Sequence, residues 1–566
     1  MSKPSRPILD RRTFLVLTGL ASATGALGLA GCSEVTGKAA AGSGKTGGGK
    51  TDGVLTVGAP VTNNQFPENF NANGGGDPAP GIGLFYETLF RISQKDAGKL
   101  LPNLALSVDY TNGGRTATYK LRDGVTWNDG EKFTADDVVF TYNFVFGPPG
   151  KDQFLKTKVH KTDDLTVVVE YNDPNFQEDT NLSAYYPIYP RHIYSKHGDH
   201  SKYQDKNPVG TGPGKLKSFN TERIEVDIRK DWWGGSAPAV SKIIFIPQGT
   251  TGNVQSQISQ GKVDWSDGGG QGVLTTFLKQ SPDNGYTYWP NGSNTGLQFN
   301  CWKGITQDKQ LRRALRAAID PTAIREAIGT GYPIPSLAGL DPQMYDGLLL
   351  PGYDKAYTQD PEAAKKALAK GGWTVKKGQL SKGGKTYPLD LLVNLDQEEH
   401  VVAAPILIDF WKQVLGLDVK QSGRADQVFQ KEIHDHSLAI WNCNLNGSAY
   451  NAFQAYSHAN LSDEAQKNGG GNQGKWKAPA SVEDALTVLK ATSPADTDAI
   501  KKELLIIQRA VVEEAPYVPF LPGGGGVMTS RKNWTSWPRF GESDYPPFSA
   551  STYNNINQTV LHLTAA

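Results

Sequence analysis

Short alternating or continuous apolar stretches recur along the chain and predict its strands. Ile224, Val226 and Ile228 alternate with charged residues, and residues 115–121 alternate in the same way, as half-buried strands do. The apolar run at 438–441 predicts a buried strand. Further strands are predicted at 54–57, 165–170, 243–246, 297–302, 389–395, around 419 and 517–521, with a short strand ending at Trp265 and an apolar helical turn at 84–90.

Apolar residues at helical spacing lie between these strands. Thr134 is a typical N-cap, because acidic residues follow it in the first turn and an apolar face continues to residue 145. Asp320-Pro321 and Asp360-Pro361 are typical helix starts. Other helices are predicted at 311–319, 401–415 and 500–514. Since strands and helices alternate repeatedly, we expect an α/β fold.

The N-terminal 32 residues have the pattern of an export signal. Paired Arg11 and Arg12 precede an uncharged run rich in Gly, Ala and Thr, and Leu29-Ala30-Gly31-Cys32 closes it. A membrane-spanning helix would be more strongly apolar. The arginine pair resembles a twin-arginine signal, and the last four residues resemble a bacterial lipobox, in which the Cys sulfur is lipidated and becomes the mature N-terminus. We therefore expect residues 1–31 to be removed and Cys32 to carry a lipid; the alternative is an ordinary secretory signal with an incidental Cys.

Residues 33–52 contain Gly, Ala, Lys and Ser with almost no apolar bulk. This composition predicts a flexible linker, which at this length holds the following domains about 25 Å from the membrane. The rest of the 566-residue chain is long enough for two to four domain-sized units. The 58 basic and 57 acidic residues nearly cancel, which argues against a nucleic-acid partner.

Three cysteines occur, at positions 32, 301 and 443. If Cys32 is lipidated, two remain in an oxidising compartment, and a Cys301–Cys443 disulfide is the simplest expectation. The alternative is that both are buried free thiols.

Four segments carry a family resemblance: 129–138, 209–213, 311–320 and 513–516. In this order they resemble the family 5 extracellular solute-binding proteins, the oligopeptide, dipeptide and nickel binders of ABC importers. The resemblance implies a two-lobed periplasmic-binding-protein clamshell (type II, cluster C), with an extra subdomain on the first lobe and the ligand between the lobes. Mapped onto this chain, lobe I comprises 53–90, 195–296 and 531–566, the extra subdomain 91–194, and lobe II 297–530.

Candidate ligand-binding residues follow the predicted strand at 438–441. Trp441-Asn442-Cys443-Asn444 matches the place where peptide-binding relatives carry Trp, Cys and an Asp that pairs with the peptide ammonium. Asn444 is the nearest counterpart and cannot supply that charge, and an unpaired buried ammonium is costly. Asn442, Asn444 and Tyr450 form a neutral hydrogen-bonding set that suits sugar hydroxyls as well as peptide amides. The alternative is that the asparagines cap a turn.

Trp265 and Trp302 are further candidates, because each is predicted at a strand end, where residues that line a lobe are found. Asn300 could hydrogen-bond a ligand or a hinge backbone. Each tryptophan could equally be a core residue. His192, His197 and His200 lie in a polar stretch without the helical spacing of a metal site, and we expect them on the surface.

These features predict a lipid-anchored substrate-binding protein on the outer face of the cell membrane. It is expected to capture peptides and deliver them to an ABC permease with its ATPase subunits; an oligosaccharide is the alternative solute. We expect a monomer without enzymatic activity, cofactor, metal or nucleic-acid partner. A secreted hydrolase is a different class of function, but no nucleophile–base or acid pair is found by spacing. A sensory ligand-binding module is the third possibility.

Overall fold

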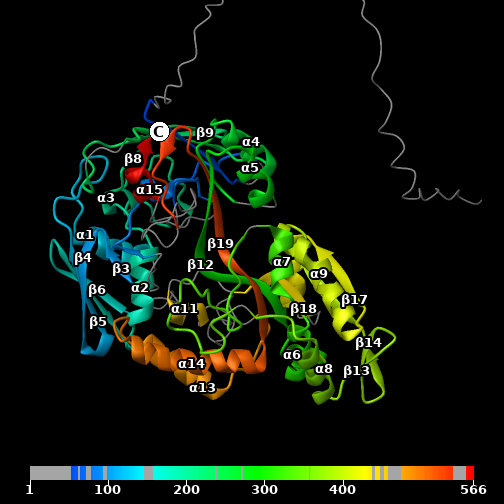
Figure 1. Cartoon of the computed structure of the whole chain (residues 1–566). Coiled ribbons are helices and arrows are strands. Elements are labelled where there is room, and N and C mark those ends of the chain that lie inside the picture. The colour runs from blue at the N-terminus through cyan, green and yellow to red at the C-terminus, as the bar shows by residue number, and fades with distance from the viewer. Residues whose placement is uncertain are drawn as a thin grey trace, which may run out of the picture. The chain divides into compact units, whose positions relative to one another are not determined.

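Two long strands, β12 (Asn284–Phe299) and β19 (Tyr517–Ser530), lie side by side in the middle of a ten-stranded sheet (Figure 1). The order of the sheet is β17-β16-β18-β12-β19-β11-β1-β10-β9-β8. The other eight strands are β1 (Val54–Ala59), β8 (Gly214–Asn220), β9 (Arg223–Ile228), β10 (Lys242–Pro247), β11 (Trp265–Asp267), β16 (Leu389–Asn394), β17 (Val419–Arg424) and β18 (Ile440–Asn444).

The chain divides into two units, Met1–Gly48 and Gly49–Ala566, and every residue described below belongs to the second. The predicted export signal, Cys32 and the linker up to residue 51 lie outside the described residues. The computed structural model describes residues 52–61, 64–71, 78–93, 99–145, 157–199, 202–235, 239–268, 272–329, 331–355, 357–435, 440–445, 451–456, 473–539 and 556–566.

Smaller sheets accompany the large one. A four-stranded antiparallel sheet has the order β4-β5-β7-β6, and a three-stranded sheet the order β13-β14-β15. Their strands are β4 (Ala105–Thr111), β5 (Thr116–Leu121), β6 (Thr157–Asp163), β7 (Thr166–Tyr171), β13 (Thr374–Lys376), β14 (Gln379–Lys382) and β15 (Lys385–Tyr387); two-stranded pairs are formed by β2 (Phe90–Ile92) with β3 (Leu100–Pro102) and by β20 (Trp534–Thr535) with β21 (Thr564–Ala565).

The helices lie between these strands in the chain, as the hydrophobic pattern predicts. They are α1 (Ala135–Phe140), α2 (Phe176–Tyr185), α3 (Arg191–Tyr194), α4 (Thr251–Ser259), α5 (Leu278–Gln280), α6 (Lys309–Ala317), α7 (Pro321–Ile328), α8 (Pro361–Lys370), α9 (Glu398–Leu415), α10 (Asp426–His434), α11 (Ala452–Tyr456), α13 (Ala480–Lys490), α14 (Thr497–Glu514) and α15 (Ile556–His562). Asp320 and Asp360 cap α7 and α8 with their side chains, as predicted. Thr134 and Asp137 form a capping box at α1, which confirms the predicted N-terminus.

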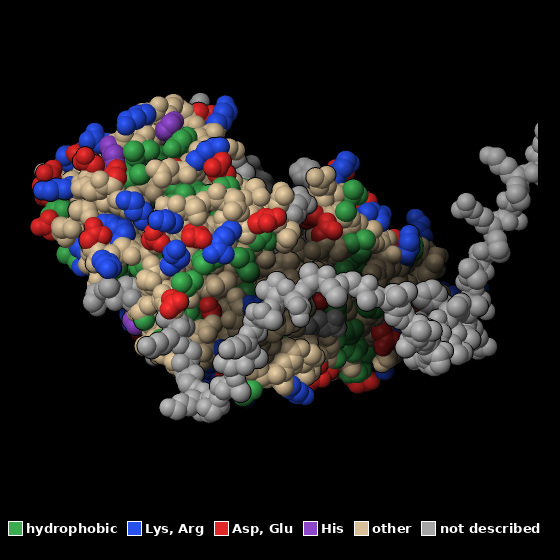
Figure 2. All heavy atoms as spheres, turned by 90° about the horizontal axis from the view of Figure 1, so that it is seen from above, with side chains coloured by type: hydrophobic (Ala, Val, Ile, Leu, Met, Phe, Trp, Pro, Cys, Tyr) green, Lys and Arg blue, Asp and Glu red, His purple; other side chains and the backbone are tan. Residues whose placement is uncertain are grey.

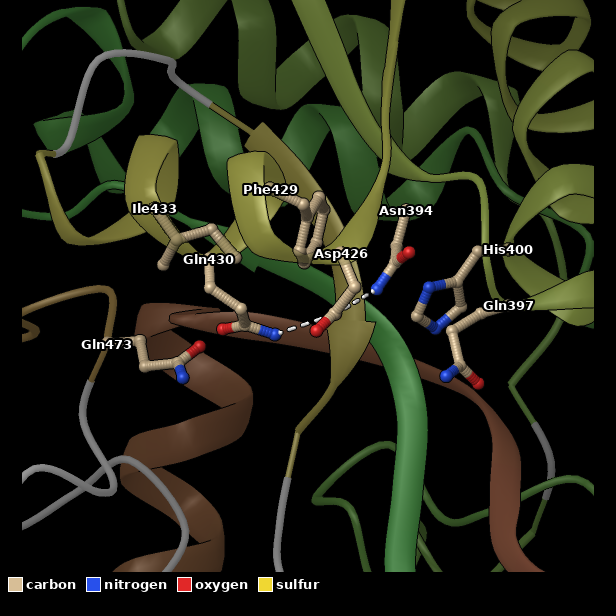
Figure 3. A pocket seen from close by; sticks show the side chains of 8 residues that line it. All are labelled: Asn394, Gln397, His400, Asp426, Phe429, Gln430, Ile433 and Gln473. Carbon is tan, nitrogen blue, oxygen red and sulfur yellow. Dashed lines mark hydrogen bonds between the residues drawn. The ribbon is translucent and has the colours of Figure 1, made fainter. Parts of the chain in front are cut away.

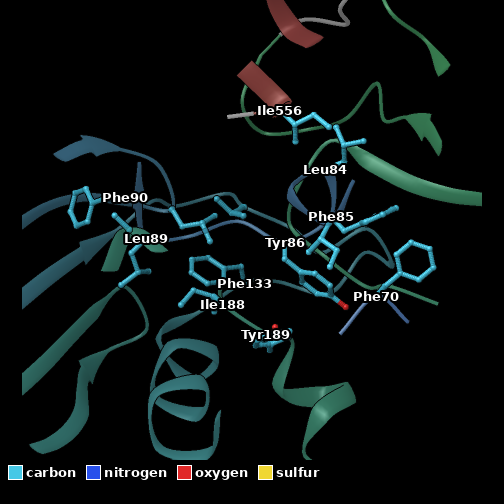
Figure 4. Packing of buried hydrophobic residues seen from close by; sticks show 14 of the residues in the cluster. Phe70, Leu84, Phe85, Tyr86, Leu89, Phe90, Phe133, Ile188, Tyr189 and Ile556 are labelled. Atoms are coloured by element: carbon cyan, nitrogen blue, oxygen red, sulfur yellow. The ribbon is translucent and has the colours of Figure 1, made fainter. Parts of the chain in front are cut away.

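Buried apolar residues form separate clusters on the two sides of β12 and β19. One cluster joins residues of β1, the four-stranded sheet and α15, and includes Phe85, Tyr86, Phe133 and Ile556 (Figure 4). Two others contain residues numbered between 297 and 521, from β16, α6, α9, α13 and α14. Among the described residues, β12 and β19 contribute apolar residues to clusters on both sides, and they therefore connect two cores.

The helical turn predicted at 84–90 is largely wrong. Only Ile82–Leu84 forms a 3-10 turn, and Phe90 already begins β2. The backbone at Phe85 instead serves a neighbouring segment, since its carbonyl oxygen accepts a 2.8 Å hydrogen bond from the N–H of Gly212. A Cβ at Gly210 would lie 1.9 Å from that oxygen, so glycine allows the close approach.

Two structural joints lie at or immediately beside the four segments that carry the family resemblance. Asn128 donates from its backbone to the Gly210 carbonyl at 2.9 Å, and its side chain reaches the Pro208 carbonyl at 3.1 Å. Arg312 on α6 donates to the carbonyl oxygens of Glu514 and Ala515 at 2.7 to 3.1 Å. Segments that are distant in the sequence are therefore held together by their own polar side chains.

Candidate functional site

The carboxyl ends of two groups of parallel strands face the same central part of β12 and β19. β1 runs parallel to β10 and β11, and β11 pairs with β19 so that Asp267, at its carboxyl end, lies opposite Val527. β16 runs parallel to β17 and β18, and the last residue of β18, Asn444, lies opposite Thr295 of β12. Ligands of α/β proteins bind beyond the carboxyl ends of parallel strands, so this central region is the candidate site.

The central part of the strand pair departs from regular sheet geometry. Its register shifts between Pro290 and Asn294 of β12. Opposite this irregular stretch, β19 contains four consecutive glycines, Gly523–Gly526. Glycine weakens a strand because it has high conformational entropy and no side chain to pack. The two strands that connect both cores are therefore least regular where the two sets of carboxyl ends meet.

A group of tyrosines covers this central stretch. Tyr286 and Tyr288 lie on β12, and the ring of Tyr332 packs on Tyr288 with a centroid separation of 4.5 Å. The Tyr288 hydroxyl lies 3.2 Å from a carboxyl oxygen of Asp341 and 3.0 Å from the Gly523 carbonyl oxygen. Burial raises the pKa of Tyr288 well above its ordinary value, so the hydroxyl stays protonated and can donate. The three half-buried rings offer apolar faces together with polar edges.

A polar pocket of about 110 Å³ lies at the carboxyl end of β16 (Figure 3). Asn394 is the last residue of that strand, and Asp426 is the first residue of α10. The first turn of α9 adds His400. The full lining is Asn394, Gln397, His400, Asp426, Phe429, Gln430, Ile433 and Gln473.

Amide groups satisfy the carboxylate in this pocket. Asn394 Nδ2 donates to Asp426 Oδ1 at 2.7 Å, and Gln430 Nε2 donates to the same oxygen at 3.2 Å (Figure 3). No lysine or arginine lines the pocket among the described residues. The lining therefore offers amide donors and acceptors together with one carboxylate, and it offers no permanent cation to a ligand carboxylate.

His400 contributes a neutral imidazole. Its side chain is 2% exposed, and burial lowers its pKa to about 4. At neutral pH the ring therefore carries one N–H donor and one acceptor nitrogen. Exposed apolar side chains lie close by in the chain: Leu395 follows β16, Val401 lies on α9 and Val428 lies on α10. The edge thus combines neutral polar groups with accessible apolar surface.

The predicted residues at 441–444 reach this edge through their backbone. Asn442 pairs with Leu297 and Val393, and Asn444 pairs with Thr295. The side chains of Trp441, Asn442, Cys443 and Asn444, and the whole of Tyr450, lie outside the described residues. Their ligand contacts therefore stay a prediction.

Trp265, a predicted ligand contact, lies in the core, which is the alternative that the sequence left open. Its side chain is fully buried in the cluster that contains β1, and its ring lies edge-on to Trp537 with a centroid separation of 6.1 Å. β11 is a short strand between β1 and β19, so a large side chain on it packs into the core.

Trp302 and Asn300 are not among the residues that line the pocket. β12 runs antiparallel to β18 and ends at Phe299 beside Ile440, the first residue of β18. The strand predicted at 297–302 therefore ends early, because Asn300 Oδ1 accepts the N–H groups of Trp302 and Lys303 in a turn. The contact of Trp302 and Asn300 with a ligand stays a prediction.

The predicted Cys301–Cys443 disulfide is also wrong, since Cys301 is a free thiol. The strand register places Cys443 opposite Gly296, and Cys301 lies five residues further along the chain. Extended backbone rises about 3.3 Å per residue, so the two cysteines are separated by far more than the roughly 7 Å that a disulfide spans. Burial raises the pKa of the Cys301 thiol to about 11, and it is therefore unreactive.

His192 and His197 contact neighbouring side chains. His192 Nε2 lies 2.8 Å from Asp129, and His197 stacks on Tyr203 with a centroid separation of 3.7 Å. Within the described ranges no group of three His, Cys, Asp or Glu residues could hold a metal ion. His200 lies outside these ranges.

Sequence reasoning missed the pocket and the tyrosines. Asn394 and Asp426 each lie at or just beyond the end of a predicted strand, so the rule that ligands bind at carboxyl ends could have found them. Tyr286 and Tyr288 gave no such signal, since β12 begins thirteen residues before the strand predicted at 297.

Comparisons with known proteins agree with this geometry. Residues 99–467 match the bacterial extracellular solute-binding proteins, family 5 Middle. The oligopeptide-binding protein OppA of Bacillus subtilis is 24% identical over 468 residues, which is 77% of this chain and 81% of OppA. The crystal structure of a periplasmic oligopeptide-binding protein of an ABC transporter from Thermotoga maritima superposes with a TM-score of 0.80 at 23% identity, covering 92% of this chain and 100% of that one. A second crystal structure of the same Thermotoga protein, with mannohexaose bound, gives a TM-score of 0.72 at 24% identity, covering 91% and 99%.

These matches define a two-lobed α/β solute-binding fold, as the resemblance implied. The chain belongs to family 5 of the bacterial extracellular solute-binding proteins. Among the described helices, none combines the length and the apolar content that crossing a bilayer requires.

Proposed function

We propose that this protein is the receptor of an ABC importer and captures peptides between its two lobes. The observation that carries the proposal is the meeting of two sets of parallel-strand carboxyl ends at the irregular centre of β12 and β19, in a chain that belongs to a solute-binding family. A solute that contacts both edges favours the closed form, which a permease can recognise. The permease and its ATPase subunits are the partners that this function needs.

The chemistry of the site supports a ligand with many neutral hydrogen-bonding groups. Amide side chains, a neutral imidazole and tyrosine hydroxyls exchange hydrogen bonds with peptide N–H and C=O groups, while exposed Leu395 and Val428 offer apolar contacts. The names of OppA and of the Thermotoga protein support peptides as the solute.

An oligosaccharide is the second candidate. The mannohexaose bound to the Thermotoga protein favours it. The amide of Asn444 also favours it, since the family resemblance implies an acid at this place for peptide binding. Tyrosine faces and amide side chains also suit sugar rings and hydroxyls.

Calorimetric titration distinguishes the two solutes. Di- to pentapeptides should bind and manno- or cello-oligosaccharides should not. Asn394→Ala should weaken peptide binding about tenfold, because it removes the hydrogen bond that orients Asp426 and one amide from the pocket lining. The exposed Gln421→Ala on β17 is a matched control that should bind as the wild type does. Binding of oligosaccharides alone would replace the peptide by a sugar, and binding of neither would contradict the proposal.

Several predictions about the chain stay part of this proposal. Lobe I is assigned to 53–90, 195–296 and 531–566, the extra subdomain to 91–194, and lobe II to 297–530. We propose that the protein acts as a monomer without turnover, and mass spectrometry should recover the bound solute intact. Lipidation of Cys32 would hold it on the outer face of the cell membrane; Cys32→Ala should then release it from the membrane fraction.

A further inference from the structure

A strongly basic surface is formed by α8 and the β13–β15 sheet. Residues 361–388 contain seven lysines and one carboxylate, Glu362, a net charge of +6 in a chain whose total is +1. All seven lysines are exposed: Lys365, Lys366, Lys370, Lys376, Lys377, Lys382 and Lys385. On the face shown in Figure 2, by contrast, basic and acidic side chains are interspersed. We call the surface formed by residues 361–388 the basic face.

Two tight turns hold these lysines in a defined arrangement. β13 and β14 are joined by Lys377 and Gly378, both with positive φ, and β14 and β15 by Gly383 and Gly384, also with positive φ. Two-residue turns of this kind match the twist of the strands they join. The Gly378 carbonyl oxygen accepts a 2.7 Å hydrogen bond from the N–H of Asp418, which ties the sheet to the segment before β17.

Positively charged side chains of the basic face lie next to each other, and their repulsion lowers the stability of the fold. Lys382 and Lys385 lie directly opposite in the β14–β15 pair, and Lys366 and Lys370 are one turn apart on α8. Both arrangements are unfavourable for an isolated fold. Only two of the seven lysines form ion pairs among the described residues: Lys365 with Glu362 and Lys382 with Asp308.

An exposed tryptophan adjoins this basic face. Trp302 is 49% exposed, and the ammonium groups of Lys303 and Lys475 lie 4.1 and 4.3 Å from its ring centroid. Gln307 donates to the Trp302 carbonyl oxygen at 2.8 Å. Its neighbour Asp308 accepts hydrogen bonds from Trp373 and from Lys382 of the basic face, at 2.9 and 2.8 Å. Trp302 and its lysines therefore continue the basic face through a short bonded segment.

The basic face is separate from the solute site. β15 precedes β16, whose first residue is Leu389, whereas the pocket lies beyond its last residue, Asn394. The indole of Trp302 is packed by Lys303 and Lys475 and is not part of the pocket lining. A ligand of the basic face consequently would not compete with the solute.

We propose that the basic face, with Trp302, docks the protein on the anionic phospholipid headgroups of a membrane surface. Clustered lysines near such a surface contribute about 1 kcal/mol each. Tryptophan is the aromatic residue that favours the headgroup region, and lysines beside it can reach the phosphates. An acidic protein would satisfy the lysines but would leave the exposed indole without its preferred environment.

Sedimentation with phospholipid vesicles tests the proposal. A chain of residues 33–566 lacks the export signal and Cys32 and keeps the complete Gly49–Ala566 unit. It should bind vesicles that contain phosphatidylglycerol at 50 mM salt, bind much less at 500 mM salt, and ignore pure phosphatidylcholine. The triple variant Lys376→Glu, Lys377→Glu, Lys385→Glu should lose at least a hundredfold in affinity, from about 1 kcal/mol for each lost lysine and the added repulsion.

A charge-matched control makes the test specific. Lys158, Lys202 and Lys217 are exposed elsewhere, and their replacement by Glu changes the net charge by the same amount. This control should retain most of the vesicle binding, and Trp302→Ala should weaken binding without changing its salt dependence. Equal loss in both triple variants, or binding to polyglutamate but not to vesicles, would overturn the proposal. Solute binding should be unchanged in all variants, so this outcome is independent of the proposed function.

Discussion

His400 links the pocket to the pH dependence of stability. Burial lowers its pKa to about 4 from the ordinary value of 6.5, so the unfolded chain binds a proton in this interval that the folded protein does not. The free energy of unfolding is therefore not reduced by this group above pH 6.5. It falls as the pH drops toward 4, because only the unfolded chain gains from protonating the imidazole. The loss amounts to about 3 kcal/mol at 1.4 kcal/mol per pKa unit.

We therefore expect His400→Gln to be less sensitive to acid than the wild type. Urea unfolding at pH 7 and pH 4.5 should show a smaller loss of unfolding free energy in this variant. His562→Gln, at an exposed position of α15, is the control and should follow the wild type. An unchanged pH dependence in His400→Gln would show that the imidazole does not stay neutral.

Buried carboxyl groups change the pH dependence of stability in the opposite direction to His400. The role of His400 must therefore be measured by comparing the wild type with His400→Gln. Burial raises the pKa of Asp179, although three tyrosine hydroxyls, from Tyr110, Tyr119 and Tyr171, donate to it. Burial likewise raises the pKa of Asp205 and Glu87. Their contribution to stability is present below the unfolded pKa and is lost as the pH rises through the folded pKa. Both proteins contain these carboxyl groups, so their contribution drops out when the unfolding free energies of His400→Gln and the wild type are subtracted.

At the scale of elements, Arg312 joins α6 to the end of α14. Its guanidinium is 2% exposed and donates to four carbonyl oxygens, those of Thr306, Gln307, Glu514 and Ala515, at 2.7 to 3.1 Å. The last carbonyls of a helix have no partner within the helix, so an arginine with several fixed donors can satisfy them. Ala515 itself adopts the left-handed conformation that ends the helix.

Arg312→Lys should lower the free energy of unfolding by about 3 kcal/mol, because an ammonium cannot reach all four oxygens and leaves buried acceptors without donors. Arg313→Lys is the matched control on the same helix, at a half-buried position, and should change stability by less than about 0.5 kcal/mol. Denaturant unfolding of both variants measures the difference. Similar losses in the two variants would contradict the assigned role of Arg312.

Elements were predicted well where their signals are local. Asp320-Pro321, Asp360-Pro361 and Thr134 each start a helix, because a cap needs only residues within one turn. The full lengths of β12 and β19 were missed, since Gly523–Gly526 and the irregular stretch near Pro290 lack the alternation of a strand. Pairing between the two strands extends them through sequences that would not predict a strand alone.

At the scale of the whole molecule, the paired strands β12 and β19 run from one hydrophobic core to the other. A Cβ at Gly526 would lie 2.6 Å from ring atoms of Tyr286, so Gly526→Ala must displace that ring in the centre of the strand pair. We expect a loss of about 1–3 kcal/mol in stability. Solute should reduce the radius of gyration of the wild type in small-angle X-ray scattering, and should do so less in this variant.

Gly252→Ala on α4 is the control, since a Cβ there meets no atom within 4 Å. It should close like the wild type and be slightly more stable, because alanine favours a helix. If solute leaves the radius of gyration of the wild type unchanged, closure between the lobes is not the response to binding.

The sequence alone determined the α/β class, the family, the helix starts that carry a local cap signal and the concentration of lysines between 361 and 388. Each of these depends on residues that are close in the chain or on segments in a recognisable order. The tertiary structure decided which strand ends meet, and therefore that Trp265 is a core residue, that Trp302 does not line the pocket, and that Cys301 and Cys443 are too far apart to bond. Such relations follow from strand direction and register, which pairing over hundreds of residues determines and local pattern does not.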